Sequence, residues 1–152
     1  MSKAFLPEDA AVDTGPVLPP RPATPLPITP EGHRRLLAER AALIPGDEAT
    51  KTRALVLDRI LASVDVVAPA LLDGGAGFGC AIDVRDERGA RRTYVLVGPD
   101  EVDPAAGRIT AESPIGRRLL RARAGDVIEL ERAGRSEELE VIAVRAGEPL
   151  VE

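Results

Sequence analysis

The chain has 152 residues, a length that suits one modest domain with an appendage. Aromatic residues make up only 2% of the sequence and the net charge is −5, which disfavours both base stacking on an aromatic platform and wrapping of free nucleic acid. A single cysteine, Cys80, and a single histidine, His33, exclude an internal disulfide and an ordinary zinc site. We expect a cytoplasmic protein, because no apolar run has the length of a signal peptide or a membrane span.

Residues 1–29 are predicted to form a disordered, extended tail. They hold half of the chain's 14 prolines, and proline removes backbone donors and resists helix formation. Such a composition cannot bury enough apolar surface to fold alone. The spacing of Pro19 and Pro22 is compatible with a docking motif or with a semi-rigid linker.

Residues 30–67 are predicted to form a short antiparallel helical hairpin. Thr29 has the character of a helix N-cap, and Pro30 suits the first helical position. Pro45 and Gly46 then interrupt the helical pattern, which resumes and continues until Pro69. Arms of roughly fifteen to eighteen residues would be about 25 Å long.

The two arms are expected to pack along one seam, with no strand between Pro30 and Val66. The second arm places apolar residues at coiled-coil spacing. The residues expected to meet are Leu36, Leu37 and Ile44 of the first arm and Leu57, Leu61 and Val64 of the second.

Two acids, Asp47 and Glu48, stand at the predicted tip of the hairpin. Acids at a helix N-terminus are favoured by the helix dipole, which explains them without a function. Alternatively, two carboxylates at the end of a finger offer hard oxygen ligands for Mg²⁺. The residues alone leave both interpretations open.

Residues 68–77 read as a glycine-rich linker, and residues 78–152 as a sheet domain. The stretch "GGAGFG" matches neither glycine-rich phosphate-binding pattern, so a flexible connector is the simpler interpretation. Beyond it, alternating strands, a turn at Gly89, a loop, a short helix started by Ser113 and Pro114, and two further strands predict the order β-β-α-β-β. The fold class is therefore α+β, with one helix packed on an antiparallel sheet.

Four arginines lie on or just after the short helix: Arg117, Arg118, Arg121 and Arg123. They form either a solvated face around buried Leu119 and Leu120 or a contact surface for an acidic partner. Cys80 alternates onto the same face as the apolar strand residues, which predicts a buried side chain rather than a reactive thiol.

The second half of the chain resembles the C-terminal domain of the bacterial Gre transcript-cleavage and elongation factors. The resemblance covers about half of the chain, and "ITPEGHRRLLAE" is similar to the family's N-terminal opening through Thr29, Gly32 and Leu36. The matching positions in the second half are Phe78, Gly79, Tyr94, Val97, Gly98, Asp100, Glu101, Asp103, Gly107, Ile109, Ser113, Pro114, Ile115, Leu119, Leu120, Gly125 and Asp126.

This resemblance implies a regulator with RNA polymerase core as its partner. The hairpin would enter the secondary channel, and an FKBP-like C-terminal domain would dock on the channel rim through Glu112, Ser113, Pro114 and Ile115. The polymerase would remain the catalyst, so the chain would be neither an enzyme nor a holder of its own metal or cofactor. It would meet nucleic acid only indirectly, within the elongation complex.

The hairpin departs from the family pattern, because it is short and turns at "PGDEAT" instead of a "DLSENAEY"-like motif. In this it is more like the regulator of nucleoside diphosphate kinase, and we expect little stimulation of transcript cleavage. The alternative within the family is a cleavage-stimulating factor that uses Asp47 and Glu48 with the Mg²⁺ of the polymerase. Two other classes are a prolyl isomerase, disfavoured because Tyr94 and Phe78 are the only aromatic residues of the domain, and a nucleic-acid-binding module using the arginines, which the net charge opposes.

Overall fold

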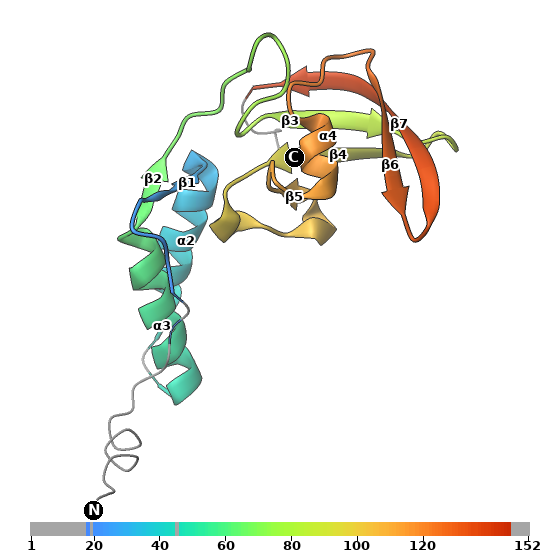
Figure 1. Cartoon of the computed structure of the whole chain (residues 1–152). Helices are drawn as coiled ribbons and strands as arrows, with labels where there is room; N and C mark the ends of the chain where they lie inside the picture. The colour runs from blue at the N-terminus through green and yellow to red at the C-terminus, as the bar shows by residue number, and fades with distance from the viewer. Residues whose placement is uncertain (1–17, 19, 45, 147–152) are drawn as a thin grey trace, which may run out of the picture.

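The computed structural model describes residue 18, residues 20–44 and residues 46–146 of the chain. A helical hairpin stands beside a curled five-stranded sheet that carries one short helix (Figure 1). The class is α+β, as predicted. Within the described ranges, no helix is both long and apolar enough to cross a membrane.

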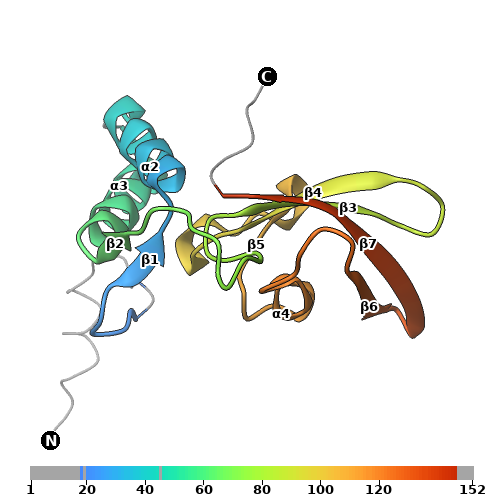
Figure 2. The same ribbon diagram turned by 90° about the horizontal axis from the view of Figure 1, so that it is seen from above.

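The hairpin consists of α2 (Pro30–Ala42) and α3 (Glu48–Leu61), which lie side by side in both views (Figures 1 and 2). The hydroxyl oxygen of Thr29 accepts a hydrogen bond from the Gly32 N–H at 3.0 Å and caps α2. Asp47 caps α3 in the same way, through the Thr50 N–H at 2.9 Å. Both helices therefore start where side-chain acceptors can satisfy their free N–H groups.

The packing between the two helices is only partly as predicted. Leu57 is fully buried, but Leu37 is 46% exposed and Ile44 is 79% exposed. Two helices alone share one narrow contact line, which cannot cover adjacent positions such as Leu36 and Leu37. Ile44 lies beyond the end of α2 at Ala42, outside the helical register that the prediction assumed.

Ion pairs add to this narrow apolar contact. Arg53 and Glu39 are 2.6 Å apart across the hairpin. Arg40 and Asp58 are 2.7 Å apart. Each pair is largely exposed, and such pairs usually contribute less than about 1 kcal/mol.

A two-stranded parallel sheet joins the base of the hairpin and corrects two predictions. Strand β1 (Leu26–Ile28) lies in the segment predicted to be a tail, and β2 (Val64–Val66) lies where no strand was expected. Helix α3 stops at Leu61, and the valine-rich residues that follow have strong strand propensity. Val64 is therefore not a seam residue. Residues 1–17 and 19 are outside the described residues, so that part of the tail stays a prediction.

The larger sheet has the strand order β5-β4-β3-β7-β6. All neighbouring pairs are antiparallel except β4 and β5. The short strand β5, paired with β4, and the 3-10 turns η2 and η3 were predicted only as a loop. The elements are β3 (Ala81–Arg85), β4 (Arg91–Leu96), η2 (Pro99–Glu101), η3 (Pro104–Ala106), β5 (Arg108–Ile109), α4 (Pro114–Leu119), β6 (Val127–Arg132) and β7 (Arg135–Arg145).

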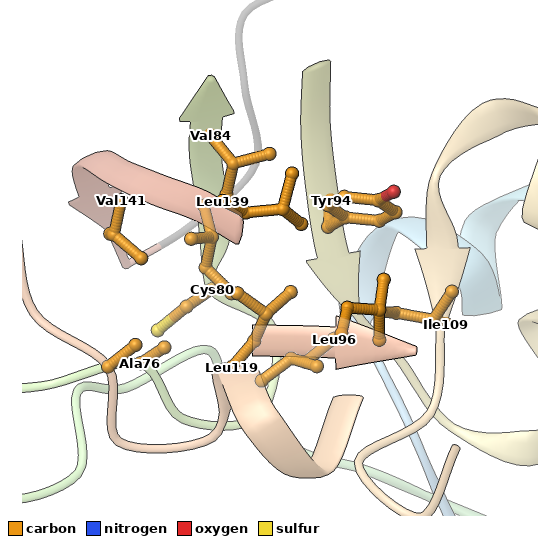
Figure 3. Packing of buried hydrophobic residues seen from close by; sticks show 12 residues of the cluster. Ala76, Cys80, Val84, Tyr94, Leu96, Ile109, Leu119, Leu139 and Val141 are labelled. Atoms are coloured by element: carbon orange, nitrogen blue, oxygen red, sulfur yellow. The ribbon is translucent and has the colours of Figure 1, made fainter. Parts of the chain in front are cut away.

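The core lies between α4 and the concave face of this sheet (Figure 3). Ile82, Leu119 and Val141 are fully buried, and Cys80 is buried with them as predicted. The Cys80 sulfur accepts a hydrogen bond from the Gly77 N–H at 3.3 Å. The core is therefore almost entirely aliphatic, with Tyr94 as its one aromatic member among the described residues.

The glycine-rich segment is not a loose connector, contrary to the prediction. Ala76 is fully buried and exchanges backbone hydrogen bonds with the residues just after α4: its N–H donates to the Ala122 carbonyl at 2.9 Å, and its carbonyl accepts from the Arg121 N–H at 2.7 Å. A Cβ atom on Gly75 would lie only 2.2 Å from the Arg121 carbonyl oxygen. Glycine is needed here because the two backbones approach too closely for a side chain.

The hairpin and the sheet domain meet through buried polar groups. Glu101 of η2 accepts hydrogen bonds from the Thr29 hydroxyl, from the Thr29 N–H at 2.9 Å and from the Gly98 N–H at 2.9 Å. Two ion pairs flank it, Arg21–Asp100 at 2.7 Å and Arg108–Glu31 at 2.9 Å. These contacts join the start of α2 and the segment before β1 to η2 and β5.

Candidate functional site

A tight corner precedes α4 at the positions where the resemblance places the docking surface. Ser113 caps the helix: its hydroxyl oxygen accepts from the Gly116 N–H at 3.0 Å and its O–H donates to the Thr110 carbonyl at 2.7 Å. A Cβ atom on Gly116 would lie 1.9 Å from the same carbonyl oxygen. The sequence Ser-Pro-x-Gly therefore folds the chain back on itself without room for a further side chain.

The four residues predicted for docking lie together but divide into two kinds. Glu112 and Pro114 are exposed. Ser113 and Ile115 are half-buried, and Ile115 packs against the core cluster. A partner can reach Glu112 and Pro114 directly, whereas Ser113 and Ile115 hold the corner in shape.

The two leucines of α4 anchor the corner to the sheet, as the sequence predicted. Leu119 is fully buried within the core, and Leu120 packs against it while half-exposed. The helix thus buries one side and presents the other to solvent. This arrangement fixes the position of Pro114 relative to the strands.

An apolar hollow of about 350 Å³ adjoins the corner and was missed by the sequence analysis. Its lining includes Ala111, just before Glu112, together with Leu72, Phe78 and Leu120. Leu71 and Leu72 are 50% and 36% exposed, although both are large and apolar. The consecutive leucines were the available signal, but they lay in a segment taken for a linker.

The arginines after the corner also divide into two kinds. Arg121 pairs with Asp73 at 3.1 Å, and Arg123 donates to the Asp73 backbone carbonyl, so both hold the glycine-rich segment. Arg117 and Arg118 are exposed, and neither has an acidic partner among the described side chains. Only these two remain as a free basic surface on α4.

The two acids at the hairpin tip, Asp47 and Glu48, both contact neighbouring residues of α3. The Thr50 N–H, hydrogen-bonded to the Asp47 carboxylate, holds the pKa of Asp47 below its ordinary value. Glu48 lies 3.4 Å from the ammonium group of Lys51. Within the described ranges, no group of three or more histidine, cysteine or acidic side chains is placed to hold a metal ion. Figure 1 shows this tip at the end of the hairpin farthest from the sheet domain.

Comparisons with known proteins identify the family. The profile described as "Transcription elongation factor, GreA/GreB, C-term" matches residues 72–146. Transcription elongation factor GreA of Rhodospirillum rubrum is 30% identical over 154 positions, which take in 80% of this chain and 98% of that protein. The chain therefore belongs to the GreA/GreB family of bacterial transcription elongation factors.

Other relatives match over a smaller share of their length. GreA of Cereibacter sphaeroides is 38% identical over 90 residues, covering 59% of this chain and 60% of that protein. GreA of Ralstonia nicotianae is 39% identical over 110 residues, covering 70% of this chain and 66% of that protein. Among solved structures, GreA/GreB from Nitrosomonas europaea has a TM-score of 0.44 at 22% identity, over 80% of this chain and 98% of that one. Gfh1 of Thermus thermophilus has a TM-score of 0.42 at 21% identity, over 80% of this chain and 99% of that one.

Proposed function

We propose that the chain binds RNA polymerase at the secondary channel through the corner before α4, and regulates elongation without being a catalyst itself. The observation that carries this proposal is the pair of exposed residues, Glu112 and Pro114, held on a rigid serine-capped corner beside an apolar hollow. Protein interfaces depend on a few anchors in well-packed surroundings. Such an action would take place in the bacterial cytoplasm.

The apolar hollow extends this proposed docking surface. Leu71 and Leu72 remain partly exposed, and with Phe78 they line the hollow. An exposed hollow of this kind accepts an apolar side chain from a partner and gains affinity by excluding water from it. The charged and proline positions of the corner would then set the orientation of the partner.

We further propose that the hairpin gives little or no stimulation of transcript cleavage. Its helices have 13 and 14 residues, which corresponds to about 20 Å of length. The Rhodospirillum rubrum alignment has 154 positions but takes in only 80% of this chain, so that relative contains residues with no counterpart here. Asp47 is already occupied as a helix cap. The alternative, in which Asp47 and Glu48 assist the Mg²⁺ of the polymerase, requires the tip to reach the active site.

Co-purification with core RNA polymerase tests the docking proposal. Pro114→Asp places a charge on the exposed part of the corner and should abolish co-purification while circular dichroism shows an intact sheet. Arg88→Glu, a charge change on the exposed turn between β3 and β4, is the matched control and should bind as the wild type does. Equal binding of the Pro114→Asp variant would place the interface elsewhere.

A further inference from the structure

The helical hairpin leaves part of its apolar surface uncovered. Leu55 of α3 is 46% exposed, and Ile44, just beyond the end of α2, is more exposed still. A hollow of about 320 Å³ is lined by residues of both arms, among them Leu43, Ala54 and Leu55. Exposed apolar surface that is rimmed by polar side chains commonly marks a contact surface for another chain.

Charges of opposite sign stand on the two sides of Leu55 along α3. Lys51, Leu55 and Asp58 follow one another at i, i+4 and i+7, so they share one face of the helix, and all three are exposed. The Lys51 ammonium lies 3.4 Å from the Glu48 carboxylate. The Asp58 carboxylate lies 2.7 Å from the Arg40 guanidinium. Because the Lys51 and Asp58 side chains are still more than half exposed, each can take a further partner of opposite charge.

This face of α3 is complementary to a second copy of itself. When two copies of α3 (Glu48–Leu61) lie antiparallel about a twofold axis between residues 54 and 55, they overlap from end to end. Lys51 of each copy then lies opposite Asp58 of the other, and Leu55 of each lies opposite the small Ala54, at the hollow. A twofold contact forms each of these pairs twice. Parallel pairing would instead bring like charges together, so the charges select the antiparallel arrangement.

The hollow faces away from the sheet domain. Glu31 of α2 contacts that domain through Arg108 of β5. Arg40, which lines the hollow, follows Glu31 by about two and a half helical turns and therefore lies on the opposite side of α2. Two copies can thus meet through α3 without a sheet domain between them, and the corner before α4 stays uncovered.

We propose that the hairpin is a self-association surface, through which two copies of the chain pair antiparallel along α3. Leu55 of each copy enters the hollow of the other, and two ion pairs between Lys51 and Asp58 close the ends of the contact. Because such a surface is small, the dimer is weak and forms as the protein concentration rises. The inference is independent of polymerase docking, since the pairing surface shares no residue with the corner before α4.

Sedimentation velocity of the full chain tests the proposal. The wild-type chain should pass from monomer to dimer between roughly 1 µM and roughly 1 mM. Leu55→Glu places a charge at the centre of the contact and should raise the dimer dissociation constant at least about tenfold, while circular dichroism shows unchanged helix content because Leu55 is already exposed. Arg88→Glu, on the turn between β3 and β4, should dimerise as the wild type does. A wild-type chain that stays monomeric, or a Leu55→Glu variant that dimerises equally well, would overturn the proposal.

Charge exchange tests the pairing of Lys51 with Asp58. Lys51→Glu and Asp58→Lys each place like charges opposite one another at both ends of the contact, so each variant should dimerise more weakly than the wild type. A mixture of the two variants brings opposite charges together again and should form a heterodimer, detected by a fluorescent label on one of them. If Asp58→Lys loses helix content, the weakening by Lys51→Glu decides alone. Undiminished dimerisation of Lys51→Glu, or a mixture of two folded variants that associates no better than either one, would contradict the proposal.

Discussion

Glu101 is expected to hold the hairpin against the sheet domain, and Glu101→Ala tests this directly. The carboxylate accepts three hydrogen bonds, two from Thr29 and one from Gly98. Thr29 is 2% exposed, so water cannot replace the lost acceptor there without rearrangement. The side chain is also closely enclosed, because a Cβ atom on Gly32 would lie 2.0 Å from one of its oxygens.

The expected loss follows from these contacts. A hydrogen bond to a charged group contributes about 1.5–3 kcal/mol, and a buried donor left without a partner costs about 1–3 kcal/mol. Because the three bonds share one carboxylate, their contributions are not additive, and we expect Glu101→Ala to lower the free energy of unfolding by about 3 kcal/mol. Glu101→Gln keeps one acceptor oxygen and should cost about half as much. Its amide group would oblige the Thr29 hydroxyl to change from donor to acceptor.

Urea denaturation measures the free energy of unfolding. The amide exchange rates of Thr29 and Gly98 report on the contact between the hairpin and the sheet domain. Exchange of both N–H groups should accelerate in Glu101→Ala. Asp103→Ala removes an exposed carboxylate from the same loop and should change stability by less than about 0.5 kcal/mol. If Glu101→Ala loses as little stability as Asp103→Ala, and amide exchange at Thr29 is unchanged, then Glu101 does not hold the junction.

Three further predictions concern the corner, the sheet and the hairpin. Gly116→Ala should destabilise the sheet domain by at least about 1 kcal/mol in thermal or urea unfolding, because the new Cβ would meet the Thr110 carbonyl at 1.9 Å; an unchanged midpoint would show that the corner can relax. Arg145, hydrogen-bonded to Asp83 at 2.6 Å, holds the pKa of Asp83 below its usual 3.8. The ion pair therefore stabilises the folded state above pH 3.8, and this stabilisation is lost as the pH falls through the lower folded-state pKa of Asp83. Asp83→Asn should lower the free energy of unfolding by up to about 1 kcal/mol at neutral pH and by almost nothing near pH 2. A loss that is independent of pH would contradict the ion pair. Leu57→Ala should lower the free energy of unfolding by about 2–4 kcal/mol and reduce helical circular dichroism, because Leu57 is fully buried. A fully helical variant would show that the seam lies elsewhere.

Local signals in the sequence predicted much of the fold. Thr29 with Pro30, and Ser113 with Pro114, each combine a cap with a residue suited to the first turn, and both helices start there. The alternation of apolar residues predicted the strand at β3 and the burial of Cys80. These features depend on residues within a few positions of one another, which sequence patterns represent well.

Features that depend on distant segments were not predicted. Strand β1 (Leu26–Ile28) exists because it pairs with β2, and the whole helical hairpin separates the two strands in the sequence. The burial of Gly75 depends on the Arg121 backbone, more than forty positions away. The acidic loop at Glu101 carried a family signature, but its contact with Thr29 could only be seen in the folded chain.

The same limit applied to the candidate site. The corner could be located from Ser113 and Pro114, but the division into exposed Glu112 and half-buried Ile115 required the packing of α4. The apolar hollow draws Leu72 from one segment and Leu120 from another. Sequence spacing gave no indication that these two segments line one surface.

The most direct measurement is a transcript-cleavage time course on backtracked elongation complexes, with a full-length Gre factor in the presence and absence of this chain. We predict that the chain alone leaves the RNA intact and slows factor-stimulated cleavage in proportion to its concentration, and that Pro114→Asp removes this inhibition. Shortening of the RNA 3′ end by the chain alone, abolished in the Asp47→Ala, Glu48→Ala double variant, would instead make the tip acids functional. No competition by the wild-type chain would contradict docking at the channel rim.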